Sequence, residues 1–362
     1  MSAVIHSFYE VNQFVSLFFI FFADIFKFGV WKEFHQLLQD NQSLVPLAKD
    51  LCSLVLESKS ENTRKCYISQ FNKWISWTRQ MNIDKIYPAF DFHVALYIVS
   101  LIQNGSSSSI IDQEFFALKW IHDLSESKNP CNSKTVISLI ETVRKLCGSS
   151  VQKKKPFTTE IIQSCFSLYP PQDTDMYHLR SLVLVVIGFA GFFRISELRN
   201  LKISDISFQD EHVEINIKKR KTDQTNKGEK VLIAKTNNIT CPYSALKLYF
   251  KKGNMSLNED KFIFGHLTFC KSKNSYKFRG SKGLSYTRCR ELIRELLTDV
   301  GLNADDYGTH SLRRGGATVS AMNSVSDRLF KKHGRWKSDR AKDGYVTENI
   351  KEKLSVSSNL GL

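Results

Sequence analysis

The spacing of hydrophobic positions changes from a helical period to a strand period and back along the chain. Between residues 43 and 150 apolar side chains recur every three or four positions, which is typical of amphipathic helices. A cap at Asn62 or Thr63 predicts the start of one helix. Three further helices are expected over Asp91–Gln103, Ser107–Asp123 and Ser133–Cys147. The pattern predicts a four-helix bundle in this region.

Residues 158–350 combine apolar helices with a short sheet. The apolar run Leu182–Ala190 indicates a buried helix that is too short, and has flanks too polar, to cross a bilayer. Val213–Lys218 alternates like a half-buried strand, and Lys230–Ala234 predicts its partner in a small sheet of about residues 203–235. The expected fold class is therefore α+β, mostly α with a small antiparallel β-sheet.

Residues 1–42 form a hydrophobic extension of unknown role. The uncharged apolar run Phe14–Ala23 has ten residues, too few to span a membrane, and the charged residues Asp24 and Lys27 come soon after it. Glu10 precedes the run and no basic stretch does, which argues against a secretory signal. A packed or partner-binding helix and a mispredicted gene start are both open interpretations. We expect neither a membrane protein nor a secreted one.

The net charge differs between the two halves of the chain. The net charge is +15, yet residues 1–150 carry fourteen basic and fourteen acidic side chains, so the whole excess lies in residues 151–362. Such an asymmetry predicts a polyanion-binding second half. Residues 265–284 contain several basic side chains among Ser and Gly, and predict a mobile basic loop that contacts DNA non-specifically.

The eight cysteines are scattered singly, with no C-x-x-C pair. This pattern suggests neither a zinc site nor a disulfide framework, and it fits a reducing compartment. Because carboxylates and histidines also lack metal-ligand spacing, we expect no metal site.

Residues 149–157 are expected to be a basic linker, because small and polar residues lead into lysines and a proline. Lys153, Lys154 and Lys155 are candidates for contact with a phosphate backbone. A nuclear-import signal competes with that interpretation on equal terms.

Four chemically different side chains occur in order near the end of the chain. Arg313 lies three residues after His310, Trp336 twenty-three after Arg313, and Tyr345 nine after Trp336. Arginine binds phosphate oxygens bidentately, histidine exchanges a proton near pH 7, and tyrosine can become a covalent nucleophile. Together these groups predict phosphoryl transfer without a metal, although H-x-x-R alone is usually a solvated helix face.

Partners for these groups lie upstream. Arg194 directly follows the apolar helix, so its charge is held at the edge of the core, where it needs an anion. Glu197 lies three residues on, a spacing that allows its carboxylate to orient Arg194. A lysine is expected at the tip of the predicted hairpin. Lys221 is our choice, with alternatives Lys218, Lys219 and Lys227.

This ordered set resembles the catalytic residues of the tyrosine recombinases of the phage integrase family. The matching positions are Arg194 in R-x-S-E-L, Lys221, His310, Arg313 and Tyr345, with Trp336 where many members have a second histidine. The G-R-W-K-S form is similar to eukaryotic recombinases of DIRS- and Crypton-type mobile elements. The catalytic resemblance covers about residues 155–350, and a weaker one covers the helical region before it.

The resemblance implies an organisation and a set of partners. Residues 43–148 would be a helical core-binding domain that clamps DNA, residues 158–350 an integrase-type catalytic domain, and residues 351–362 a tail. The expected partners are double-stranded DNA and further copies of the chain, as a tetramer on DNA, with no cofactor, ATP or small-molecule substrate. A eukaryotic chain would act in the nucleus, and any other in the cytoplasm with DNA.

The resemblance also implies roles. Arg194 and Arg313 would clamp the phosphate, Trp336 would donate its indole N–H, and Lys221 would protonate the leaving oxygen. Deprotonating a tyrosine of pKa near 10 at pH 7 costs about 4 kcal/mol, which His310 as base and the two arginines would offset. We expect Arg314, Arg335 and Lys337 to contact the DNA backbone, and His333 to be a bystander.

Three functions fit this set of residues. We favour a site-specific recombinase or integrase that forms a 3′-phosphotyrosyl intermediate. A type IB topoisomerase would use the same chemistry, but the R-x-S-E-L and H-S-L-R-R-G-G-A-T stretches favour the integrase branch. A catalytically silent, domesticated DNA-binding protein is the third, and the intact residue set argues against it.

The charge asymmetry predicts how two fragments differ. A fragment of residues 151–362 should bind duplex DNA with a steep inverse dependence on salt, whereas residues 43–150 should bind weakly, because counterion release scales with the phosphates neutralised. Titrations at several salt concentrations measure both slopes. Equal slopes would contradict the asymmetry argument.

Overall fold

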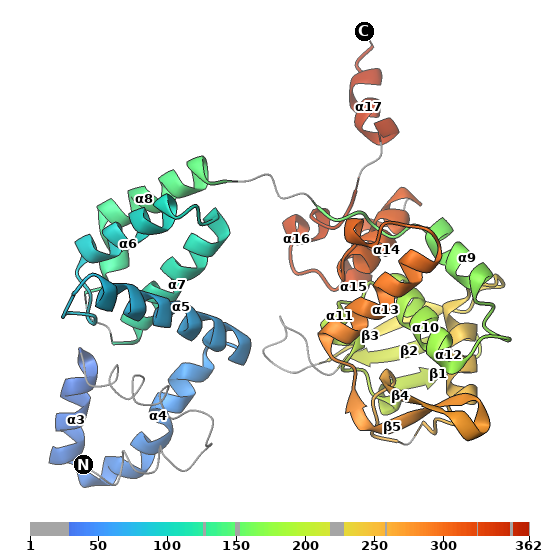
Figure 1. Cartoon of the computed structure of the whole chain (residues 1–362), viewed down its shortest axis with the longest axis horizontal. Coiled ribbons are helices and arrows are strands. Elements are labelled where there is room, and N and C mark those ends of the chain that lie inside the picture. Colours follow the sequence, from blue (N-terminus) through green and yellow to red (C-terminus); the bar gives the residue numbers. More distant parts are fainter. Residues whose placement is uncertain are drawn as a thin grey trace. The chain divides into compact units, whose positions relative to one another are not determined.

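The computed structural model describes residues 29–125, 128–148, 153–217, 228–257, 259–323, 325–347 and 350–361. The chain divides into two compact units, Met1–Val151 (unit 1) and Gln152–Leu362 (unit 2) (Figure 1). Helices dominate, and the strands form two small antiparallel sheets, so the expected α+β class is confirmed. Among the described residues no helix is long and apolar enough to cross a membrane.

Unit 1 contains the helices that periodicity predicts. They are α5 (Glu61–Gln80), α6 (Asp91–Gln103), α7 (Ser108–Leu124) and α8 (Lys134–Leu146). Trp74 is fully buried between them. Ser107 and Ser133 cap α7 and α8 as their positions suggest. The predicted cap of α5 is wrong: the Ser60 hydroxyl, not Asn62 or Thr63, accepts the bond, from the backbone N–H of Thr63.

Part of the N-terminal extension belongs to unit 1. Helix α3 (Val30–Asp40) leads through η1 (Gln42–Leu44) into α4 (Val45–Glu57). Trp31 is buried and donates its indole N–H to the Leu124 carbonyl at 2.6 Å. Of the interpretations left open for this extension, the packed helix applies to α3, because Trp31 is buried within unit 1. The sequence could not decide between them, because a helix that covers a bundle has the same pattern as one that binds a partner. The run Phe14–Ala23 lies outside the described residues.

Unit 2 is organised around one buried helix, α10 (Met176–Ala190), which corresponds to the predicted apolar run. Helices α9 (Thr159–Leu168), α12 (Pro242–Lys252), α13 (Tyr286–Asp299) and α14 (Ser311–Met322) all contact it. Consecutive residues from Leu179 to Gly188 are buried, so the helix has no solvent-facing stripe along that stretch. Its end leads directly into α11 (Ile195–Leu198), which begins after Arg194.

The predicted small sheet is present and has three strands. Strands β1 (Ile206–Phe208), β2 (His212–Ile217) and β3 (Glu229–Ala234) pair antiparallel in the order β1-β2-β3. Ile215 lies opposite Ile206 on one side and Val231 on the other, and all three side chains face the core. Lys221 and its alternatives Lys218, Lys219 and Lys227 fall between β2 and β3, outside the described residues.

The expected basic loop is instead a two-stranded ribbon. Strand β4 (Gly265–Cys270) pairs with β5 (Ser275–Gly283). On β5, Phe278 packs toward Tyr249 while Lys277 and Arg279 are exposed. The alternation of aromatic and basic residues was a strand signal, and the density of lysine and serine concealed it. The ribbon thus presents basic side chains on a fixed framework.

The last helices gather at one end of unit 2. They are α14, α15 (Asp327–Gly334) and α16 (Asp339–Asp343), drawn in orange to red in Figure 1 at the end away from β4 and β5, and α17 (Ile350–Ser358) comes after them in the chain. The neighbouring backbone can lie close to α14 because this helix contains two adjacent glycines, Gly315 and Gly316. A Cβ on Gly315 would lie 2.1 Å from the Phe157 carbonyl oxygen, and one on Gly316 would lie 2.2 Å from the Phe189 carbonyl oxygen.

A stability measurement tests this close approach. Gly315→Ala should lower the free energy of unfolding by about 1–3 kcal/mol, because backbone must move to admit the methyl group. Ser320→Ala, at a half-exposed position of the same helix, is the control and should change stability by less than about 0.5 kcal/mol. Denaturant unfolding of both variants gives the comparison. Equal stabilities would contradict the close packing at Gly315.

Candidate active site

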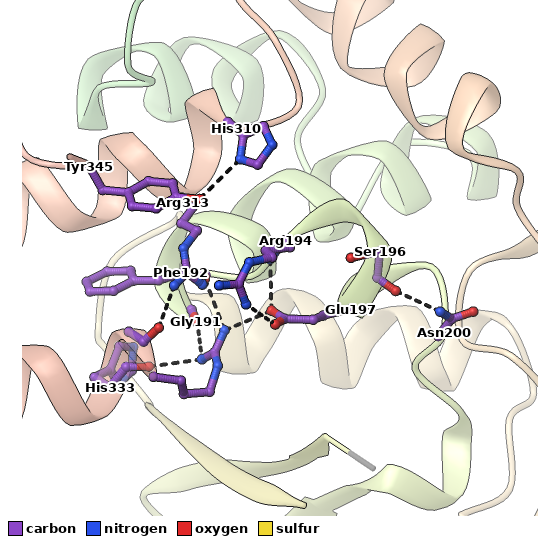
Figure 2. A network of polar contacts seen from close by, with 12 residues as sticks. Gly191, Phe192, Arg194, Ser196, Glu197, Asn200, His310, Arg313, His333 and Tyr345 are labelled. Carbon is purple, nitrogen blue, oxygen red and sulfur yellow. Dashed lines mark hydrogen bonds and ion pairs between the residues drawn. The ribbon is translucent and has the colours of Figure 1, made fainter. Parts of the chain in front are cut away.

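Five of the six residues singled out from the sequence meet at the junction of α10, α11, α14 and α15. Figure 2 shows Arg194, His310, Arg313 and Tyr345 converging from different segments of unit 2. Trp336 joins them through its ring, which lies 5.7 Å from the ring of Tyr345. Residues more than a hundred positions apart therefore form one site.

Arg313 is the most deeply buried member and is fully inaccessible to solvent. Its guanidinium carbon lies 4.8 Å from the ring centre of Trp336 and 4.8 Å from that of Tyr345, so two aromatic faces hold the cation. Its terminal nitrogens donate to the carbonyls of Phe192 and Gly334. These contacts fix the guanidinium plane directly beside the phenol.

Glu197 orients Arg194, as their spacing predicts. Its Oε1 accepts a bond from Arg194 Nη1 at 2.7 Å, and its Oε2 accepts the backbone N–H of Arg194 at 2.9 Å. The carboxylate therefore caps α11 and holds the arginine side chain at once. Arg194 stays 19% exposed at the side chain, so it remains open to a ligand.

His310 and Tyr345 face each other at the open side of the site. His310 is exposed at the N-cap of α14, and its Nδ1 lies 3.4 Å from the Tyr345 hydroxyl. Tyr345 comes just after α16, and the Gly344 carbonyl before it accepts a bond from Arg314 at 3.3 Å. A histidine nitrogen is thus placed to receive the phenolic proton with a small movement.

Two buried donors of the site lack an acceptor among the described residues. Trp336 is only 6% exposed, and within the described part of the chain its Nε1–H has no hydrogen-bond partner. The same holds there for the Nε–H of Arg313. An unsatisfied buried donor costs about 1–3 kcal/mol. Both donors therefore fit a ligand that brings oxygen acceptors.

The site also carries excess positive charge. Among the described residues, Glu197 is the carboxylate that the guanidinium groups of Arg194, Arg313 and Arg335 share. Burial, followed by the neighbouring Arg194 and Arg335, lowers the pKa of Arg313 to about 9. Burial alone would raise the pKa of Glu197, but Arg335 and Arg194 outweigh it and keep that pKa below its usual value. Three cations against one anion favour a bound phosphodiester.

The predicted DNA-contact residues differ in their contacts. Lys153 and Lys337 have exposed side chains. Lys154 donates to the Asp305 carbonyl at 2.5 Å, and Lys155 pairs with Asp306 at 2.8 Å, so both fasten the linker to the segment that precedes α14. Arg314 donates to the Lys154 carbonyl at 2.9 Å. The four lysines are exposed and Arg314 is half-buried, so a phosphate can reach them if it replaces their present partners.

The prediction for Arg335 is wrong. Its side chain is 1% exposed and forms an ion pair with Glu197 at 2.9 Å. Each terminal nitrogen of Arg335 already donates to two acceptors inside the fold, so a backbone phosphate would have to displace one of them. The local pattern was misleading, because an arginine between glycine and tryptophan after a helix looks like part of a polar loop. The one available signal was its position, where a helix end often requires a left-handed residue.

In the view of Figure 2, His333 lies below Phe192, on the side away from Tyr345. Its Nε2 is 2.8 Å from the Ala190 carbonyl, which can only accept, so this nitrogen carries the proton. Burial lowers the pKa of His333, which favours the neutral ring. The arrangement suits a packed residue better than a base. Among the described residues no cluster of His, Cys, Asp or Glu could hold a metal ion.

Comparison with known proteins supports the geometry. A model of the phage integrase family matches residues 160–352. The "Integrase/recombinase xerD homolog" of Selenomonas ruminantium is 24% identical over 296 residues, which are 81% of this chain and 83% of the relative.

Two solved structures share the fold. The XerH site-specific recombinase bound to palindromic difH substrate, in a post-cleavage complex, is 16% identical with a TM-score of 0.57, covering 83% of this chain and 79% of that one. A lambda integrase dimer bound to a COC′ core site is 14% identical with a TM-score of 0.51, covering 82% and 75%. Because the family model spans more than half of the chain, the protein belongs to the phage integrase family of tyrosine recombinases.

Proposed function

We propose that this protein is a site-specific DNA recombinase that cuts and rejoins DNA through a 3′-phosphotyrosyl intermediate. One observation carries the proposal: the ring of Trp336, whose buried N–H has no partner among the described residues, and the Arg313 guanidinium both lie beside the ring of Tyr345. A nucleophile next to donors that lack an acceptor is the arrangement that phosphoryl transfer requires. Membership of the family supplies the reaction class.

In the proposed first step the Tyr345 oxygen attacks the scissile phosphorus. A P–O(tyrosine) bond forms, the bond from phosphorus to the 5′-oxygen breaks, and the phenolic proton passes to His310. Arg194, Arg313 and Trp336 stabilise the charge that builds on the non-bridging oxygens. Lys221 gives the leaving 5′-oxygen its proton. The phosphotyrosyl bond conserves the energy of the original ester, so religation needs no ATP.

The proposed partners are duplex DNA and further copies of this chain, as a tetramer on DNA. Support comes from the XerH complex with its difH substrate and from the lambda integrase dimer on a core site, both of which share this fold. The charge of residues 151–362 and the basic ribbon β4–β5, which contains no acidic residue, fit a polyanion. We assign Lys153, Lys154, Lys155, Arg314 and Lys337 to backbone contacts in this complex.

We further propose the finer assignments that the resemblance suggests. Residues 43–148 act as the core-binding domain, 149–157 as the linker and 158–350 as the catalytic domain. The G-R-W-K-S stretch around Trp336 favours a DIRS- or Crypton-like enzyme of a eukaryotic mobile element, acting in the nucleus. The assembled site makes a catalytically silent DNA-binding protein the weaker alternative, and family membership does the same for a type IB topoisomerase.

Covalent capture of DNA tests the function directly. A nicked suicide duplex carrying the element's own ends should trap the unchanged protein in EDTA, because the arginines supply the charge that a metal-dependent enzyme takes from its ions. Tyr345→Phe should abolish the adduct and leave duplex binding nearly unchanged, since only the nucleophilic oxygen is lost. Denaturing gels and binding titrations measure both. An adduct with Tyr345→Phe, or a strict need for magnesium, would refute the assignment.

A second variant isolates the indole donor. Trp336→Phe keeps an aromatic face against Arg313 but removes the N–H, so single-turnover cleavage should slow by roughly 100- to 1,000-fold, the usual effect of losing one transition-state donor. DNA affinity and thermal stability should change little. An unaltered cleavage rate would mean that Trp336 serves only to pack the site.

A further inference from the structure

We propose that Arg335 is a positioning residue for the reaction, which sets the two phosphate-binding arginines in place without touching DNA. The inference rests on the proposed function and assigns to this buried side chain a part in it. Arg335 joins the carboxylate that orients Arg194 to the carbonyl that holds Arg313.

Four hydrogen bonds define the Arg335 guanidinium. Nη1 donates to the carbonyls of Gly191 and His333, each at 2.9 Å. Nη2 donates to the Phe192 carbonyl at 3.0 Å and to Glu197 Oε2 at 2.9 Å. Its central carbon also lies 4.9 Å from the ring centre of Phe193. A planar fork with several donors can satisfy these acceptors together, whereas a lysine ammonium has one nitrogen.

The first connection runs through Glu197 to Arg194. Glu197 Oε2 accepts from both Arg335 Nη2 and the Arg194 backbone N–H, and its Oε1 accepts from Arg194 Nη1. Because the carboxylate is only 3% exposed, water offers it little alternative. Without Arg335, only Arg194 would bond to this buried carboxylate, and Arg313 would add its charge nearby. The carboxylate could then rotate and move Arg194 with it.

The second connection runs through the Phe192 carbonyl to Arg313. Nη1 of Arg313 and Nη2 of Arg335 share this one oxygen. Two like charges therefore lie on either side of a single acceptor, and the nearby Glu197 makes that close approach tolerable. A shift of the carbonyl would move Arg313 relative to Trp336 and Tyr345.

The backbone gives an independent reason to assign a role to Arg335. This residue has φ 57° and ψ 39°, and Phe192 has φ 48°, so both bonded residues lie in the left-handed region that favours glycine. Such conformations persist in side-chain-bearing residues when surrounding contacts enforce them, and they concentrate at functional sites. If this residue only ended helix α15, glycine would adopt the left-handed conformation at a lower energetic cost.

Single-turnover cleavage of two substrates tests the inference. One duplex carries the normal phosphodiester, and the other carries an uncharged methylphosphonate at the scissile position. Arg335→Gln should slow cleavage of the phosphodiester roughly 100-fold, the effect of misplacing groups by about 1 Å. On the methylphosphonate the loss of cleavage rate should be at least tenfold smaller, because this linkage lacks the negative charge that the arginines bind. Arg335→Lys should recover only part of the rate, because it keeps the charge but lacks the fork.

The controls separate position from folding and from DNA contact. Arg328→Gln, at an exposed position of α15, should cleave both substrates at the normal rate. The salt dependence of duplex binding should be unchanged in Arg335→Gln, because a buried side chain releases no counterions. If Arg335→Gln does not fold, the ratio of the two substrates is read from Arg335→Lys.

Three results would contradict the proposal, each for a different reason. A weaker salt dependence of duplex binding in Arg335→Gln would mean that Arg335 contacts the DNA backbone. That result would overturn the inference. Equal losses on the two substrates, or none, would also overturn it and make Arg335 a stability residue only. Failure of the unchanged protein to cleave either duplex would overturn the proposed function and, with it, this role.

Discussion

A single carboxylate with too many cations around it is the constraint on which the rest of unit 2 depends. Glu197 balances one of the charges on Arg194, Arg313 and Arg335, and the others persist because burial, carbonyl oxygens and aromatic faces hold them. The site without ligand is therefore electrostatically incomplete. Folding stores that imbalance, and a phosphodiester would relieve it. Stability and function thus compete at this one point.

The packing around α10 makes that imbalance tolerable. The helix is buried along most of its length, and its end delivers Gly191, Phe192 and Arg194 to the site on a rigid support. Helix α14 can approach because Gly315 leaves room for the Phe157 carbonyl. Preorganisation of this kind requires rigid elements, since loops alone could not hold like charges together.

The sequence predicted the structure correctly where the spacing of hydrophobic residues, or one short motif, was enough to define an element or a contact. The helices at residues 91–147, the strands β2 and β3, and the grouping of Arg194 with Glu197 could be predicted from spacing alone. The burial of Arg335 could not, because it depends on carbonyls 143 and 144 residues away in the chain. The ribbon β4–β5 and the packing of Trp31 had weak local signals that polar composition or an ambiguous pattern obscured. Position 221 lies outside the residues that the structure describes.

The contact between Arg313 and the Phe192 carbonyl has a consequence for synthesis of the protein. It closes a loop of 121 residues, and Tyr345 reaches the site later still along the chain. Long-range closures are entropically costly and slow to form. A nascent chain can complete α10 and the sheet well before Tyr345, the proposed nucleophile, has been translated. Tyr345 therefore leaves the ribosome only after the other residues that surround it in the site.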